Sequence, residues 1–250
     1  MKDTRDIMGM PVIIDIVGEG HASLEPLFDY FRSVDERFSP YKASSEVSRI
    51  NRGEIAPSEY SLEMQEVFDL AEETKRVTRG FFDIRTPDGS IDPSGIVKGW
   101  AIKKVADLAH ANGHRNYWIE AGGDIQVSGH NEEGGAWTAG IRNPFNEKEI
   151  VKVVRLQDRG IATSGTYIRG KHIYDPHTKR SVSSGDVSVT VIGPDVYEAD
   201  RFATAAFAMG EEGIQFIESL EGFEGYSIDE NGQATLTSGF SGYVEGGSRS

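Results

Sequence analysis

The sequence predicts an α+β fold, in which antiparallel sheets are flanked by helices, because helical and strand patterns occur in separate blocks. Residues 23–113 mostly carry apolar side chains at helical spacing, whereas residues 116–193 mostly carry strand patterns. No repeat or low-complexity linker divides the chain. We therefore expect a single domain over residues 1–250, with a loose tail from about residue 244.

The N-terminal half is predicted to contain one strand followed by helices. The strand is the apolar run PVIIDIV, residues 11–17. Ser23 is placed to cap the first helix, Leu62 is expected on the inward face of the third, and Gly80 and Gly113 are stop signals. The helices are expected over residues 23–38, 44–51, 58–79 and 96–112.

The C-terminal half is predicted to be mostly strands, closed by two helices and two short strands. The strands are expected over residues 116–121, 124–129, 137–142, 149–156, 160–165 and 186–193. The helices are expected over residues 196–209 and 212–220. Helical and strand blocks in this order argue against a doubly wound parallel sheet.

The charge balance excludes some classes of partner. The chain of 250 residues has 26 Lys and Arg against 40 Asp and Glu, a net charge of -14. Without a basic run interleaved with aromatics, nucleic acid is not expected as a partner. A phosphate ligand would need local help from a divalent metal, a few placed cations or backbone N–H groups. The chain has no cysteine, which excludes disulfides, zinc thiolate sites and a cysteine nucleophile.

The first twenty residues hold only one short apolar run, interrupted by Asp15 and closed by Gly18. This run is too short and too polar for a signal sequence or a membrane span. We expect a cytoplasmic protein without a membrane span, although a chain trimmed of an export segment would look the same.

The stretch EADRFATAAFAMG, residues 198–210, is an Ala-rich helix with oxygens on its packing face. Asp195 and Glu198 form a capping-box pattern, so Asp200 and Thr204 stack at i and i+4 within the helix. One interpretation is structural, with the threonine bonding back to its own helix. The other is a site for a hard cation such as Mg²⁺ or Ca²⁺, which prefers oxygen ligands.

Two further motifs suit a phosphate ligand. Gly122, Gly123 and Asp124 form a GGD turn between strands, which fits an ordinary hairpin and also a close backbone approach to phosphate. In IDPSGIVKGW, Asp92 and Pro93 fit a helix start or the turn before one. Lys98 follows near the helix N-terminus, where a cation is disfavoured unless it faces an anion.

Polar chemistry also gathers in TSGTYIRGKHIYDPHTKR, residues 163–180. His172, Asp175 and His177 could be considered a metal triad, but their spacing fits no single helix face. A single histidine acting as a general base is the favoured interpretation.

A common nicotinamide site is excluded by the order of elements. That site needs a strand, a Gly-x-Gly-x-x-Gly turn and a helix, whereas EAGGDIQVSG runs from one strand through Gly-Gly into another. The aromatic residues Tyr41, Phe81 and Phe82 could pack against a wide ring system such as isoalloxazine or adenine.

The motifs in chain order resemble those of the ApbE family of flavin transferases, from Met8 to about Gly210. They are MGM, FSPY, GFFDI, IDPSGIVKGWAI, EAGGDIQVSG, WTAGIRNP, IATSGTY, KHIYDP and EADRFATAAFAMG. The resemblance implies an ApbE-like, T-fold-like architecture. It also implies cleavage of FAD with Mg²⁺, transfer of FMN to a Thr or Ser of an acceptor flavoprotein, and release of AMP.

The resemblance also implies the site residues. It makes Asp200 and Thr204 side-chain ligands of Mg²⁺, together with the main-chain oxygens of Gly95 and Ala203. It places Gly122, Gly123 and Asp124 beside the diphosphate and makes His172 the base for the acceptor hydroxyl. The implied flavin or nucleotide contacts are Met8, Tyr41, Phe81, Phe82, Asp83, Asp92, Lys98, Ser164 and Ile173.

The sequence departs from the family pattern in three places. The segment between GFFDI and IDPSG is much shorter than usual, which would open the active site or alter acceptor choice. Pro93-Ser94 replaces the usual Leu-Gly, and SPY stands for STY. Two alternative functions stay open: an FAD pyrophosphatase, with water as acceptor at the same site, and a carrier that binds flavin without chemistry.

Overall fold

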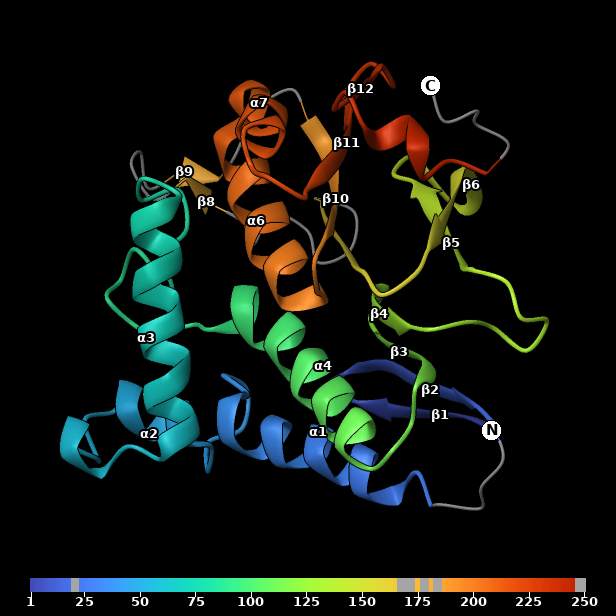
Figure 1. Ribbon diagram of the computed structural model, residues 1–250. Helices are drawn as coiled ribbons and strands as arrows, with labels where there is room; N and C mark the ends of the chain where they lie inside the picture. The colour runs from blue at the N-terminus through green and yellow to red at the C-terminus, as the bar shows by residue number, and fades with distance from the viewer. Residues whose placement is uncertain (19–22, 166–173, 176–179, 182–185, 246–250) are drawn as a thin grey trace.

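The computed structural model describes residues 1–18, 23–165, 174–175, 180–181 and 186–245. Its main element is an 8-stranded sheet, in the order β1-β2-β3-β4-β7-β10-β11-β12, and every strand pair in it is antiparallel (Figure 1). These strands are β1 (Lys2–Ile7), β2 (Met10–Val17), β3 (Asn116–Ala121), β4 (Asp124–Ser128), β7 (Gly160–Gly165), β10 (Asp186–Gly193), β11 (Glu224–Asp229) and β12 (Ala234–Leu236). The predicted α+β class is confirmed.

Two smaller sheets complete the strands. One pairs β5 (Trp137–Asn143) with β6 (Asn146–Leu156), and the other pairs β8 (Tyr174–Asp175) with β9 (Arg180–Ser181). The α-helices in the described residues are α1 (Glu25–Phe38), α2 (Glu46–Asn51), α3 (Leu62–Val77), α4 (Ser94–Ala111), α6 (Val196–Met209) and α7 (Gly213–Glu218). Short 3-10 turns occupy Pro57–Glu59, Gly210–Glu212 and Phe240–Gly242.

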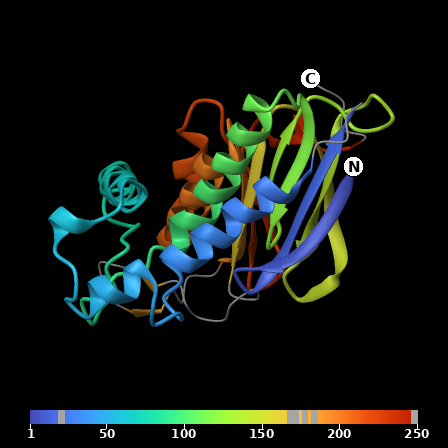
Figure 2. The ribbon, with the colours of Figure 1, turned by 90° about the horizontal axis from the view of Figure 1, so that it is seen from below.

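The main sheet is covered on both faces, which explains why its central strands β4, β7 and β10 are mostly buried. Helices α1, α4 and α6 lie on one face and the β5–β6 hairpin on the other (Figure 2). Val191 of β10 packs with α6, whereas the next residue, Ile192, packs with the hairpin. Alternate side chains therefore enter two different cores, as the two-residue period of a strand requires.

Two glycines bring α6 close to its neighbours. A Cβ on Gly99 of α4 would lie 2.6 Å from the Asp200 Cβ, and one on Gly160 of β7 would lie 2.0 Å from the Val196 backbone nitrogen. Only glycine fits at such contacts, because the atoms met are backbone or the stem of a buried side chain. Helix α6 is thus held tightly between α4 and the sheet.

The structure differs from the sequence prediction in several elements. Strand β1 was not predicted, and Leu62, expected to face inward, is 83% exposed because α3 begins there and buries Met64 instead. Ser61 caps α3, so the helix predicted over residues 58–79 is divided into a 3-10 turn and α3. Val244 pairs with Val154, and Glu245 N donates to Val153 O, so these two residues are not part of a loose tail.

Candidate functional site

Helix α6 positions Asp200 and Thr204 as the sequence predicts. Asp195 is its N-cap and accepts from Glu198 N, although the Glu198 carboxylate binds Arg201 instead of completing a capping box. Asp200 is only 2% exposed, and its Oδ2 accepts from Gly99 N of α4 at 2.8 Å. A carboxylate is therefore buried where α4 crosses α6.

Lys98 joins this carboxylate to a second one. Its ammonium forms an ion pair with Asp124, at the start of β4, and lies 3.5 Å from Asp200 Oδ1. The other Asp124 oxygen accepts from Thr163 N of β7 at 3.1 Å. These contacts explain a cation near the N-terminus of α4, because Lys98 faces anions supplied by the protein itself. Lys98, Asp124 and Asp200 are called here the Lys98 cluster.

The Lys98 cluster has a surplus negative charge, because two buried carboxylates share one ammonium. Burial raises the pKa of Asp124 to about 7, Lys98 opposes this change, and Asp200 adds to it. Such an arrangement is costly unless another cation joins it. The donor set thus fits a hard divalent metal, although no group of three His, Cys, Asp or Glu that could hold a metal occurs among the described residues.

The remaining predicted metal ligands lie beside Thr204. Its hydroxyl is 3.2 Å from Ser164 Oγ of β7, instead of bonding back to its own helix. A Cβ on Gly95 would lie 3.5 Å from Thr204 Cγ2 and 3.3 Å from Phe82 Cε2, so the first turn of α4 closes over this threonine. Ala203 is fully buried in α6. Phe82, Gly95, Ser164 and Thr204 are therefore brought together.

The GGD motif is the turn between the interior strands β3 and β4, and Asp124 is the first residue of β4. Gly122 and Gly123 have φ of 60° and 97°, which glycine adopts without strain. A Cβ on Gly122 would lie 2.8 Å from Met10 Sδ, which places the β1–β2 turn beside this one. That turn contains Met8, itself at a φ of 58°. Met8 and the GGD motif thus lie at one end of the sheet.

The other predicted flavin contacts lie around the short segment that links α3 to α4. Asp83 is paired with Lys75 at 2.7 Å, and Asp92 Oδ1 accepts from Ser94 N in the turn before α4. Phe81 is partly exposed, and Tyr41 is 93% exposed. A pocket of about 450 Å³ opens here, lined by Pro40, Asn51, Thr86, Pro87, Asp88, Ser90, Ile91 and Asp92.

Two predicted residues, His172 and Ile173, lie outside the described residues, as does His177. Sequence reasoning missed two groups of the site, the Gly99 amide and the Thr163 amide, which hold Asp200 and Asp124 in place. Both are backbone donors from distant segments, so no side-chain pattern could signal them.

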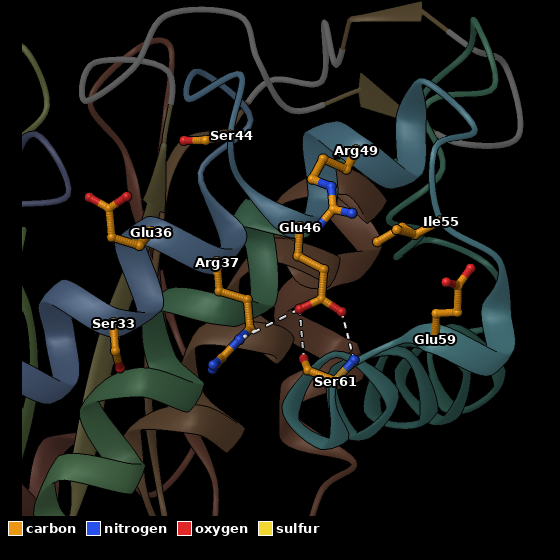
Figure 3. A pocket seen from close by; sticks show the side chains of 9 residues that line it. All are labelled: Ser33, Glu36, Arg37, Ser44, Glu46, Arg49, Ile55, Glu59 and Ser61. Atoms are coloured by element: carbon orange, nitrogen blue, oxygen red, sulfur yellow. Dashed lines mark hydrogen bonds and ion pairs between the residues drawn. The ribbon is translucent and has the colours of Figure 1, made fainter.

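A larger pocket, of about 560 Å³, lies among α1, α2 and the start of α3, and it contains none of the predicted site residues (Figure 3). Its central carboxylate, Glu46, accepts from the backbone and hydroxyl of Ser61, both at 2.7 Å, and Arg37 lies 3.5 Å away. Because Glu46 fixes the N-terminus of α3 through these bonds, its role is structural. The lining is Ser33, Glu36, Arg37, Ser44, Glu46, Arg49, Ile55, Glu59 and Ser61.

Fold and site together define an α+β protein with a buried acidic cluster suited to a hard cation. The model of the ApbE family matches residues 8–88 and 84–227, so the chain belongs to the ApbE family. It is 37% identical to the FAD:protein FMN transferase of Vibrio cholerae over 135 residues, 50% of this chain and 40% of that protein. A transferase of the same name from Haemophilus influenzae is 25% identical, over 87% of this chain and 81% of that protein.

Solved structures agree with this membership. The flavin transferase ApbE from Vibrio cholerae superposes with a TM-score of 0.84 at 25% identity, covering 97% of this chain and 98% of that one. The apbe protein from Thermotoga maritima gives a TM-score of 0.86 at 21% identity, over 98% and 99% of the two chains, which supports the fold. The chain spans less than half the length of the first curated relatives it matches. None of the described helices is both long enough and apolar enough to cross a bilayer.

Proposed function

We propose that this chain is a Mg²⁺-dependent FAD:protein FMN transferase, which cleaves FAD, attaches FMN to a Thr or Ser of an acceptor flavoprotein and releases AMP. Membership of the ApbE family and relatives named as FAD:protein FMN transferases support this proposal. The observation that carries it is the Lys98 cluster, in which two buried carboxylates share one ammonium beside Thr204 and Ser164.

The proposed Mg²⁺ ligands are Asp200 and Thr204, with the main-chain oxygens of Gly95 and Ala203. A hard cation held here would neutralise the charge of a diphosphate. The residues fit such an ion, because the Lys98 cluster has a surplus negative charge and Thr204 presents its hydroxyl beside Ser164.

The chain's own groups would hold the dinucleotide around this point. The positive end of the α4 dipole favours a phosphate, and the backbone at Gly122 and Gly123 can approach it closely. Lys98 adds a positive charge that its two carboxylates hold in place. The proposed contacts to the flavin and nucleotide are Met8, Tyr41, Phe81, Phe82, Asp83, Asp92, Lys98, Asp124, Ser164 and Ile173.

The proposed chemical step is a phosphoryl transfer. The acceptor hydroxyl forms a bond to the phosphorus on the FMN side, the bond from that phosphorus to the AMP oxygen breaks, and AMP leaves. The hydroxyl proton goes to His172, the base that the family motif implies. Positioning and charge stabilisation supply most of the acceleration in such reactions, so few oriented groups suffice.

The test is to incubate the purified chain with FAD, Mg²⁺ and a flavoprotein domain that carries a threonine beside its flavin site. Covalent flavin is followed by the fluorescence of the acceptor band after denaturing electrophoresis, and AMP by chromatography. We expect one AMP for each flavin attached. AMP release without any flavinylated acceptor would indicate a pyrophosphatase, and FAD binding without AMP would indicate a carrier.

A further inference from the structure

Arg201 is a buried charge on the helix that holds the predicted metal ligands. It is 6% exposed, and its Nε and Nη2 donate to Glu198 Oε2 at 2.9 and 2.6 Å. Its guanidinium also lies 4.4 Å from the centre of the Phe202 ring. Successive helix residues point about 100° apart, so Arg201 and Asp200 lie on different faces of α6. Arg201 is therefore outside the Lys98 cluster.

The remaining guanidinium nitrogen of Arg201, Nη1, contacts helix α3. Arg201 Nη1 donates to Thr74 Oγ1 of α3 at 3.1 Å, and both partners are buried. Figure 2 shows α3 end-on at one side of the molecule, farther from the sheet than α1, α4 and α6. Arg201 Nη1 also lies 4.0 Å from Glu73 Oε1, likewise on α3. Because a guanidinium is costly to bury without hydrogen bonds, these contacts link α3 to α6.

From Thr74 the hydrogen bonds continue into the predicted flavin-binding segment. Thr78 Oγ1 donates to Thr74 O at 2.7 Å and accepts from Phe82 N at 3.2 Å. The Phe82 ring lies beside Gly95, which in turn closes over Thr204. A continuous set of contacts therefore runs from Arg201 through the end of α3 to Phe82, and back to the helix on which it began.

We propose that Arg201 is a positioning residue for flavin binding: it acts through Thr74 to hold the end of α3, and hence residues 81–83, against the helix that carries Asp200 and Thr204. The inference rests on the proposed function, because residues 81–83 are expected to contact the flavin. It assigns Arg201 no contact with the substrate. Loosening the link should weaken FAD binding more than it slows the chemical step.

The test removes the hydrogen bond from Arg201 to Thr74, while Arg201 keeps its ion pairs with Glu198 and Glu73. Thr74→Val deletes the hydroxyl at nearly constant volume, and Thr74→Ser retains it. The matched control is Tyr30→Phe, which removes a 2.9 Å hydrogen bond from Tyr30 to Glu63 at the other end of α3. For each variant the Kd for FAD with Mg²⁺, the KM and kcat of AMP release and the Tm are measured.

We expect Thr74→Val to raise Kd and KM on the order of tenfold with kcat within about twofold, because ground-state binding is lost. Thr74→Ser should behave like wild type, and Tyr30→Phe should lower Tm without changing Kd. A Thr74→Val protein with lower Tm but unchanged Kd, or an equal rise of Kd in Tyr30→Phe, would overturn the inference. A wild-type protein that neither binds FAD nor releases AMP would instead overturn the proposed function and this inference with it.

Discussion

Lys98 determines the charge state of the proposed site, since it is the ammonium placed between Asp124 and Asp200. Its position also explains why both carboxylates can be buried: each has a backbone amide on one oxygen and Lys98 near the other. In the part of the chain that the structure describes, Lys98 is the only cation paired with these two carboxylates.

Asp200→Asn should keep the bond from Gly99 N while removing one of the two charges that share Lys98. Lys98 retains its pair with Asp124, so we expect the variant to be at least as stable as wild type without metal. Mg²⁺ should raise the Tm of wild type and not that of the variant, because binding to the folded state stabilises it. Thermal unfolding with Mg²⁺ or EDTA measures this change in Tm. An equal rise in Tm for both proteins would contradict the assignment of Asp200 as a metal ligand.

Asp186 should make the stability of the protein depend on pH. Burial, reinforced by Asp229 and Glu211, raises the pKa of Asp186 to about 6. Because this folded-state pKa lies above the unfolded value, the group favours folding at low pH and this contribution is lost as pH rises through about 6. Asp186→Asn should therefore be more stable than wild type at about pH 7.5, with the difference disappearing below about pH 4.

Urea unfolding of the Asp186→Asn and wild-type proteins across this pH range measures the difference directly. Glu218→Gln serves as the control, because hydrogen bonds from Ser238 lower the pKa of that exposed carboxylate, so its loss should not stabilise the protein at neutral pH. A difference between Asp186→Asn and wild type that stays constant with pH would contradict the assigned cause.

At the scale of elements, the attachment of α6 to the sheet depends on a glycine. Gly160→Ala would place a Cβ against the backbone of Asp195 and Val196, where α6 begins, and no side chain there can move aside. We expect a loss of about 1–3 kcal/mol in the free energy of unfolding, as overpacked cores show. Gly135→Ala is the control, since its nearest contact is an ordinary 3.7 Å. Denaturant unfolding measures the free energy of unfolding of both variants. An equal loss in Gly160→Ala and Gly135→Ala would show that the close contact at Gly160 is not the cause.

Helices and buried strands could be predicted because the spacing of their apolar residues shows which side chains pack in the core. Strands β3, β7 and β10 have the predicted bounds. Strand β1 could not be predicted, because KDTRDI carries one apolar residue and forms by pairing its backbone with β2 at the edge of the sheet. The start of α3 was also missed, since a cap at Ser61 does not interrupt the apolar pattern.

The candidate site could be predicted only where neighbours in sequence share its chemistry. Asp200 and Thr204 were expected from their i, i+4 spacing, and Lys98 from a position that required an anion. The anions could not be identified, because Asp124 lies 26 residues from Lys98 and reaches it only through the pairing of β4 with β3 and β7. Arg201 gave no signal beyond being a charge in an Ala-rich helix.

At the scale of the whole molecule, the short segment between α3 and α4 shapes the predicted flavin region. Asp92 N donates to Ile84 O, and Asn51 of α2 bonds both backbone groups of Ile91, so this segment is a small fixed hairpin. The adjoining pocket of about 450 Å³ lies between this hairpin and the segment after α1.

The net charge of the whole molecule bears on which ligand it can bind. With a net charge of -14, the protein should bind a dinucleotide only where local cations oppose that field. We expect FAD to bind with an affinity that depends on Mg²⁺, and NADH not to bind, because the β3–β4 turn leads into a strand and not a helix. Calorimetric titration with each ligand measures these affinities. Binding heat with NADH but not with FAD would contradict the prediction that FAD is the ligand.

AMP release and flavin attachment, measured with FAD and the acceptor flavoprotein present, should be compared between wild type and Asp200→Asn, each with Mg²⁺ and with EDTA. Wild type should release AMP with Mg²⁺ only, and the variant, although folded, should be slower by about 100-fold or more, because one charged ligand of the cation is lost. Equal AMP release by the two proteins, or release that persists in EDTA, would contradict the proposed function.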